Sequence, residues 1–162
     1  MTKRTYEDDS IRVYWDSSLC IHTGLCIRFG QGVFDSSRRP WVDLELSDTA
    51  AIMTAIEACP TGALTYERLD GGSQEEPAVP TTIVPWPNGP LFVRGNLEVS
   101  DRHGESFLVG PRAALCRCGE SDNQPFCDLS HRAAGFKDYP QALNPIRDTA
   151  LCPDDISPTG LE

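Results

Sequence analysis

The sequence of 162 residues lacks any long apolar run. No stretch approaches the length that a membrane-spanning helix requires, and the first ten residues, MTKRTYEDDS, contain no apolar segment of the kind found in signal peptides. These absences argue against a membrane anchor and against export. We therefore expect the protein to be cytoplasmic.

Positive charge is also scarce. The chain has 14 Lys and Arg against 24 Asp and Glu, which gives a formal net charge of -10. Such acidity disfavours binding to nucleic acids or membranes and favours a protein partner with a basic docking surface. The acidity can equally serve solubility alone. No catalytic nucleophile and no substrate-cradling loop can be recognised, which argues against a conventional enzyme.

Proline, glycine and cysteine, by contrast, are well represented. The 13 prolines and 13 glycines predict short elements joined by many loops. A chain of this length forms one ordinary domain or two small ones, and small domains need help from a metal. Because the chain has no export signal, its seven cysteines indicate metal binding or chemistry rather than structural disulfides.

The hydrophobic pattern predicts short strands and helices in the first part of the chain. Residues 11–16, IRVYWD, alternate as a strand, and residues 63–67, ALTYE, read as a return strand. Between them, Ser47 is expected to cap a helix that runs to about Ala58. A cluster of Gly, Ser, Glu and Pro at 69–78 is the expected linker.

After this linker the pattern changes to short strands. We expect them at 91–94, 96–100 and 106–109, separated by turns that contain glycine. Residues 138–162 contain four prolines and little periodicity, so they are expected to form an irregular tail, in which Cys152 is a spare thiol.

Three cysteines and a histidine gather in LCRCGESDNQPFCDLSH, residues 115–131. Cys116 and Cys118 are two apart, so on an extended segment their thiolates project to one side. Cys127 and His131 are four apart, which places them on one face of a helix. Three thiolates and an imidazole suit either an iron-sulfur cluster or zinc, although zinc sites usually separate paired cysteines by two to four residues.

Two residues inside this segment affect the expected helix. Asp128 is placed to cap its first turn. Leu129 lies in that turn, where leucine favours a helix more than glycine does, so we expect no backbone strain.

The segment fits the signature C-x-C-x2-(S/T)-x3-P-x-C-D-G-(S/T/A)-H at every fixed position except one, where Leu129 replaces glycine. It resembles the CDGSH iron-sulfur family over residues 81–136. The resemblance implies a [2Fe-2S] cluster and, because CDGSH folds are commonly dimeric, a homodimer. It implies that Cys116 and Cys118 bind one iron and that Cys127 and His131 bind the other, with Asp128 and Ser130 beside the ligands. Leu129 is expected to shield His131 from water or to reshape the docking surface.

A second constellation lies in the first part of the chain. Cys20 and Cys26 form C-x5-C, and Cys59 precedes Pro60 in CPTGAL. With VFD and RPWV, residues 6–68 resemble a divergent single-cluster bacterial ferredoxin domain in which Thr23 replaces the central cysteine of C-x2-C-x2-C. This resemblance implies a ferredoxin-like fold and a cluster held by Cys20, Cys26 and Cys59.

Three thiolates satisfy a [3Fe-4S] cluster, which we favour because Thr23 is a poor iron ligand. A [4Fe-4S] cluster would need a fourth ligand, from His22, water or a distant group. We expect His22 to be a hydrogen-bonding neighbour of the cluster rather than a ligand.

The expected architecture is therefore α+β, with a ferredoxin-like domain at 1–68, a linker at 69–78, a small β-rich CDGSH domain at 79–137 and a tail at 138–162. The leading functional hypothesis is a carrier that passes single electrons to a partner redox enzyme. One alternative is delivery or sensing of the [2Fe-2S] cluster, because its His131 ligand can titrate. The others are an enzyme that uses an open iron at the N-terminal cluster, and a purely structural zinc protein.

Overall fold

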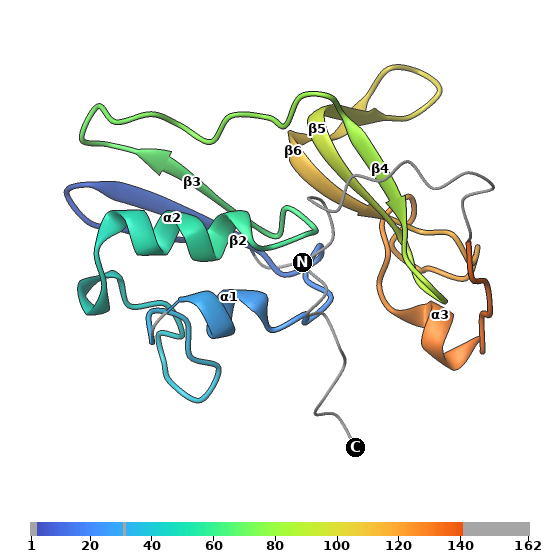
Figure 1. Ribbon diagram of the computed structural model, residues 1–162, viewed down its shortest axis with the longest axis horizontal. Coiled ribbons are helices and arrows are strands. Elements are labelled where there is room, and N and C mark those ends of the chain that lie inside the picture. The colour runs from blue at the N-terminus through green and yellow to red at the C-terminus, as the bar shows by residue number, and fades with distance from the viewer. Residues whose placement is uncertain (1–2, 31, 141–162) are drawn as a thin grey trace.

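Two antiparallel sheets of three strands each organise the part of the chain that the structure describes (Figure 1). The structure is a computed structural model that describes residues 3–30 and 32–140, so most of the expected tail, with Cys152, lies outside the described residues. The first sheet has the order β1-β2-β3 and the second the order β4-β5-β6. The strands are β1 (Lys3–Glu7), β2 (Ile11–Asp16), β3 (Leu64–Arg68), β4 (Thr82–Pro85), β5 (Leu91–Ser100) and β6 (Ser106–Leu115).

Short helices connect the strands, and the fold is α+β, as the sequence predicts. The described residues form α1 (Leu25–Phe29), the 3-10 helix η1 (Leu44–Leu46), α2 (Thr49–Glu57) and α3 (Ser130–Ala133). Helix α2 packs against both α1 and β3. Within the described residues, no helix has both the length and the apolar character needed to cross a bilayer.

The N-terminal cap of α2 differs by one residue from the prediction. Asp48, not Ser47, caps the helix, because its carboxylate accepts a hydrogen bond of 2.8 Å from the Ala51 amide. Ser47 has an extended backbone at the end of η1. Both residue types can cap a helix, and the preceding 3-10 turn decides which of them occupies the capping position.

The strands are partly as predicted. The strand at 11–16 is confirmed as β2, and the return strand β3 begins and ends one residue later than expected. The prediction of separate strands at 91–94 and 96–100 is wrong, because β5 runs through Gly95 with a shift in its pairing to β6. Gly95 has a φ of 151°, and a Cβ atom there would lie 2.2 Å from Thr81 Oγ1, so the bulge requires glycine.

The two sheets share one hydrophobic core. Ile11 and Ile56 from the first half belong to the same buried cluster as Val93, Ala113 and Phe126 from the second half. The expected linker is also attached: Gln74 exchanges hydrogen bonds with the backbone of Arg68. The division at 69–78 remains a prediction, but the structure places apolar contacts across it.

Arg112, in β6, joins the two halves through its guanidinium group. Its side chain is only 1% exposed, and it donates hydrogen bonds to the carbonyl oxygens of Ile56, Cys59 and Leu64. It also forms a bidentate ion pair with Glu75, in which Nε lies 2.9 Å from one carboxylate oxygen and Nη2 lies 2.7 Å from the other. Arg112 therefore satisfies backbone carbonyls at the end of α2 and the start of β3 from a strand of the other sheet.

Gly62 allows β6 to approach this turn. Its φ is +72°, and a Cβ atom there would lie 2.5 Å from the carbonyl oxygen of Arg112. A side chain at this position would therefore collide with the backbone of β6 as well as strain the turn.

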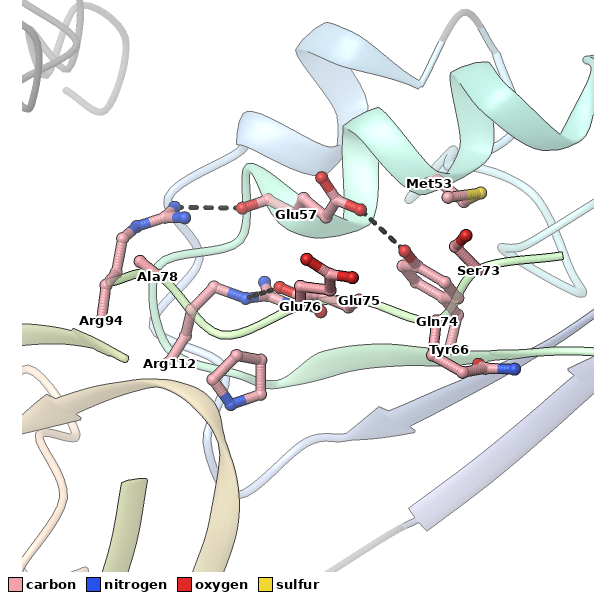
Figure 2. A pocket seen from close by; sticks show the side chains of 11 residues that line it. Met53, Glu57, Tyr66, Ser73, Gln74, Glu75, Glu76, Ala78, Arg94 and Arg112 are labelled. Carbon is pink, nitrogen blue, oxygen red and sulfur yellow. Dashed lines mark hydrogen bonds and ion pairs between the residues drawn. The ribbon is translucent and has the colours of Figure 1, made fainter. Parts of the chain in front are cut away.

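A polar cavity of about 340 Å³ lies beside Arg112 (Figure 2). On its wall, the Glu57 carboxylate accepts a hydrogen bond of 2.7 Å from the Tyr66 hydroxyl, and the Glu57 carbonyl accepts one of 3.0 Å from Arg94. Burial lowers the pKa of Arg94. The prominent polar groups around this cavity are thus engaged with one another.

Arg112→Met should lower the free energy of unfolding by about 3–5 kcal/mol, because it leaves Glu75 and three carbonyls without their buried partner. Urea denaturation of the anaerobically purified protein, followed by circular dichroism, measures this loss. Arg12→Met is the matched control, since Arg12 forms ion pairs with Glu7 and Glu67 at the surface. Equal losses for the two variants would show that the buried site has no special role.

Candidate metal centres

The candidate ligands of the C-terminal site form two pairs. The sulfur atoms of Cys116 and Cys118 lie 3.7 Å apart, and the Cys127 sulfur lies 3.4 Å from Nδ1 of His131. A tetrahedral metal with usual bond lengths places two sulfur ligands about 3.8 Å apart, and sulfur and nitrogen ligands about 3.6 Å apart. Each pair therefore has the spacing of two ligands on one metal atom.

Backbone pairing at the end of β6 brings these two pairs together. The Cys116 amide donates to the Pro125 carbonyl at 2.8 Å, and the Cys127 amide donates to the Ala114 carbonyl at 2.9 Å. Ser121 closes the loop between the pairs, since its hydroxyl donates to the Phe126 carbonyl at 2.7 Å. These hydrogen bonds hold the two pairs next to each other.

The segment from Cys127 to His131 is not the helical turn that the sequence predicts. Helix α3 begins only at Ser130, and Leu129 is its N-cap residue, with a left-handed φ of 77°. The expectation that Leu129 lies in the helix without backbone strain is therefore wrong. The turn around Leu129, rather than a helix face, brings Cys127 and His131 together.

Asp128 holds this turn in place. One carboxylate oxygen accepts from the Ser130 amide at 2.9 Å, although Leu129 and not Asp128 occupies the capping position of α3, and the other accepts from the Asp122 amide at 2.9 Å. The hydrogen bonds from Ser130 are the main reason why the pKa of Asp128 falls to about 2. Asp128 therefore ties the loop of the first ligand pair to the turn of the second.

Protonation differs among these ligands. Burial raises the pKa of Cys127 and lowers that of His131, so the imidazole is neutral and able to bind a metal at neutral pH. Burial also acts to raise the pKa of Cys116, but hydrogen bonds from the backbone amides of Ser121 and Gly119 outweigh it and lower the pKa. Metal binding at this site must therefore release protons from the buried thiols.

Arg117 anchors the segment between the first two ligands, and the sequence reasoning missed it. Its guanidinium donates to the carbonyls of Gly89 and Trp86, at 3.0 and 2.7 Å, and forms an ion pair with Asp138. It also lies over the Phe136 ring, 5.2 Å from its centre. The signal available in the sequence is an arginine placed directly between two cysteines.

The N-terminal site brings together three thiols from separate elements. Cys20 follows β2, Cys26 lies in α1 and Cys59 follows α2. Burial, with a smaller contribution from the nearby Cys59, raises the pKa of both Cys20 and Cys26, and that of Cys26 reaches about 12. The electrostatic influence of Cys59 on both other thiols places the three in one region of the fold.

The neighbours of these thiols are placed as follows. Nδ1 of the exposed His22 lies 3.8 Å from the Cys20 sulfur, and the Thr61 hydroxyl lies 3.5 Å from the Cys59 sulfur. Thr23 is half-buried between the first two cysteines. In the described part of the chain, no three His, Cys, Asp or Glu side chains are grouped as a site for a single metal ion.

Two sets of candidate cysteine ligands on one folded unit suit metal binding, and comparison with known families indicates an iron-sulfur protein. Residues 6–69 match the family described as a divergent 4Fe-4S mono-cluster, and residues 88–132 match the iron-binding zinc finger of CDGSH type. The chain belongs to the divergent 4Fe-4S mono-cluster family and carries a CDGSH-type domain after it. Both resemblances predicted from the sequence are thus confirmed.

Similar proteins occur in Escherichia coli. The protein YjdI of strain K12 is 36% identical over 63 residues, which cover 39% of this chain and 83% of YjdI. YjdI of strain O157:H7 matches with the same identity and coverage.

Asp128→Ala should weaken metal retention at the C-terminal site by about 10- to 100-fold, the usual effect of removing a group that orients ligands. The rate at which iron is lost to a chelator measures this change. Asp122→Ala is the matched control, because it removes the same charge but keeps the backbone amide that binds Asp128. Equal loss from both variants would contradict the orienting role of Asp128.

Proposed function

We propose that this protein is a two-cluster electron carrier. The observation that supports this proposal is the pairwise spacing at the C-terminal site, which suits two metal atoms with two protein ligands each. Cys116 and Cys118 would hold one iron of a [2Fe-2S] cluster, and Cys127 and His131 the other. Each cluster, when bound, supplies a one-electron redox centre.

At the N-terminal site we propose a [3Fe-4S] cluster, held by Cys20, Cys26 and Cys59 in a ferredoxin-like domain. The three thiolates are soft ligands suited to iron-sulfur chemistry, and no fourth cysteine stands at the Thr23 position. A [4Fe-4S] cluster is the alternative. His22, exposed and near the Cys20 sulfur, is proposed as a neighbour that donates or accepts a hydrogen bond.

The surface beside the N-terminal site supports docking of a partner. Ile27 and Phe29, on the same short helix as Cys26, are 44% and 40% exposed. Apolar side chains next to a redox site provide contact area, and the net charge of -10 favours a partner with a basic surface. We propose a redox protein as this partner, with no role for nucleic acid or membranes, and a homodimer through the CDGSH-type domain.

Delivery of the [2Fe-2S] cluster is the second candidate function. It is supported by the uneven burial of the ligands, because Cys116 and Cys118 are half-buried whereas Cys127 and His131 are buried. A more exposed pair gives an acceptor access to one side of the cluster. Catalysis at an open iron of the N-terminal site has no such support in the described residues.

The anaerobically purified protein should contain iron and sulfide rather than zinc, and should show two separate one-electron reduction steps in a potentiometric titration. Cys118→Ala should remove one step and Cys26→Ala the other, because each removes a ligand of one site only. Zinc in place of iron, or no redox response, would overturn the proposal. Transfer of iron and sulfide to a cluster-free acceptor, without electron transfer to a redox protein, would favour delivery.

Thr23→Cys tests the nuclearity of the N-terminal cluster. It restores a thiolate at the position of the central cysteine, so a [3Fe-4S] cluster should convert to a [4Fe-4S] cluster. The electron paramagnetic resonance signal of the oxidised [3Fe-4S] form should disappear, and one more iron should bind per chain. His22→Cys is the control, since we do not expect His22 to be a ligand. An unchanged iron content in Thr23→Cys would favour a [4Fe-4S] cluster in the parent protein.

A further inference from the structure

The loops that carry the two ligand sets are in direct contact. Ile21, which follows Cys20 of the N-terminal site, is only 6% exposed and packs in a small cluster with Ala114 and Cys127. Cys127 is a ligand of the C-terminal site and is 4% exposed. The residue next to a candidate ligand of the first site therefore packs in the same buried cluster as a candidate ligand of the second.

A hydrogen bond also joins the same two loops. The side-chain amide of Asn123 donates to the Ser18 carbonyl at 2.7 Å. Asn123 lies in the loop between the two ligand pairs of the C-terminal site, and Ser18 lies two residues before Cys20. The two loops are thus joined by both apolar and polar contacts.

Leu129 adds its side chain to this contact. It packs, with Phe92, against the cluster formed by Ile21, Ala114 and Cys127. Its backbone has a φ of 77°, which glycine adopts without strain and leucine adopts at a cost in conformational energy. The chain therefore keeps a strained backbone at the one fixed position where it departs from the CDGSH signature, and the side chain gained there covers the junction of the two sites.

We propose that Ile21 and Leu129 are positioning residues that form a water-excluding seam between the two ligand sets and couple them into one electron-transferring unit. We define the seam as Ile21, Ala114, Cys127, Phe92 and Leu129. The proposal rests on the proposed function, because it requires a cluster at each site. The seam fixes the two ligand loops relative to each other and keeps water from the space between them.

The coupling has a simple redox balance. One electron passes between the two sites, so that the donor site is oxidised by one electron and the acceptor site is reduced by one. No bond between heavy atoms is formed or broken. The electron enters from an external one-electron reductant, which is a redox protein in the proposed function and dithionite in the test.

Two substitutions of Leu129 distinguish the effect of its side chain from that of its backbone, and one substitution of Ile21 tests the other side of the seam. Leu129→Ala removes most of the side chain but keeps the strained conformation. Leu129→Gly removes both, and Ile21→Val trims the opposite side of the seam by one methylene group while leaving every ligand in place. Leu46→Ala is the control, because Leu46 is 51% exposed in η1 and lies outside the seam.

Three measurements on the full-length, cluster-loaded protein test the proposal: the magnetic interaction between the reduced sites, the rate at which an electron redistributes between them, and hydrogen exchange at the Ile21 amide. In both Leu129 variants we expect a weaker magnetic interaction, severalfold slower redistribution and severalfold faster exchange, with unchanged iron content. Ile21→Val should show a smaller change in the same direction, and Leu46→Ala should match the parent.

The outcomes distinguish the coupling from the proposed function. If the parent protein holds two reducible clusters but shows no magnetic interaction, or if Leu129→Ala leaves interaction, rate and exchange unchanged, the seam does not couple the sites and the inference is overturned. If the parent holds fewer than two reducible clusters, the proposed function fails, and the inference fails with it. A change in Leu129→Gly alone would assign the effect to the backbone and also overturn the role of the side chain.

Discussion

The buried guanidinium group of Arg112 is the interaction on which the rest of the structure depends. A charge in an apolar interior is costly unless all of its hydrogen-bonding groups are satisfied. Arg112, in the second half, meets this condition only with groups from outside its own half: the carbonyls at the end of α2 and the start of β3, and the carboxylate of Glu75 in the connecting segment. Arg112 binds the carbonyl of Cys59, and Cys116 directly follows β6, the strand that carries Arg112. This single side chain therefore helps to position both sets of candidate ligands.

The two candidate metal sites are built in different ways. The C-terminal site is local: a strand end, a loop and a turn within sixteen residues place two close ligand pairs, held by Asp128, Ser121 and backbone hydrogen bonds. The N-terminal site collects one thiol from each of three separate elements, so its geometry depends on the packing of α1 and α2. The first can be ordered by short-range contacts, whereas the second requires the core to be formed. The contact through the seam joins the C-terminal site, which is built from one short segment, to the N-terminal site, which is built from distant segments.

Features that depend on local contacts could be predicted from the sequence, whereas features that depend on long-range contacts could not. The candidate ligands, the hydrogen bond from the Ser130 amide to Asp128 and the strand β2 depend on neighbours in the chain, and the residue types and their spacing indicate them. The sequence predicts a turn at Gly95. The bulge found there could not be predicted, because it depends on the pairing of β5 with β6, which no local pattern shows. Leu129 reads as a helical residue because leucine has that propensity, whereas the turn between two ligands imposes a left-handed backbone. Arg112 gives a weak signal, a charge in the apolar run PRAAL, and its partners lie up to 56 residues away.

The close approach at Gly62 has a consequence for how such a chain can evolve. The first half supplies a residue without a side chain where the backbone of the second half passes, and the second half supplies an arginine that fits the carbonyls of the first. Each half has thus become adapted to the other at an atomic level. Replacing one half by a related domain would bring either a side chain at position 62 that collides with β6 or an arginine without acceptors. Glycine at position 62 and arginine at position 112 are therefore expected to be kept or lost together where the two halves share one chain.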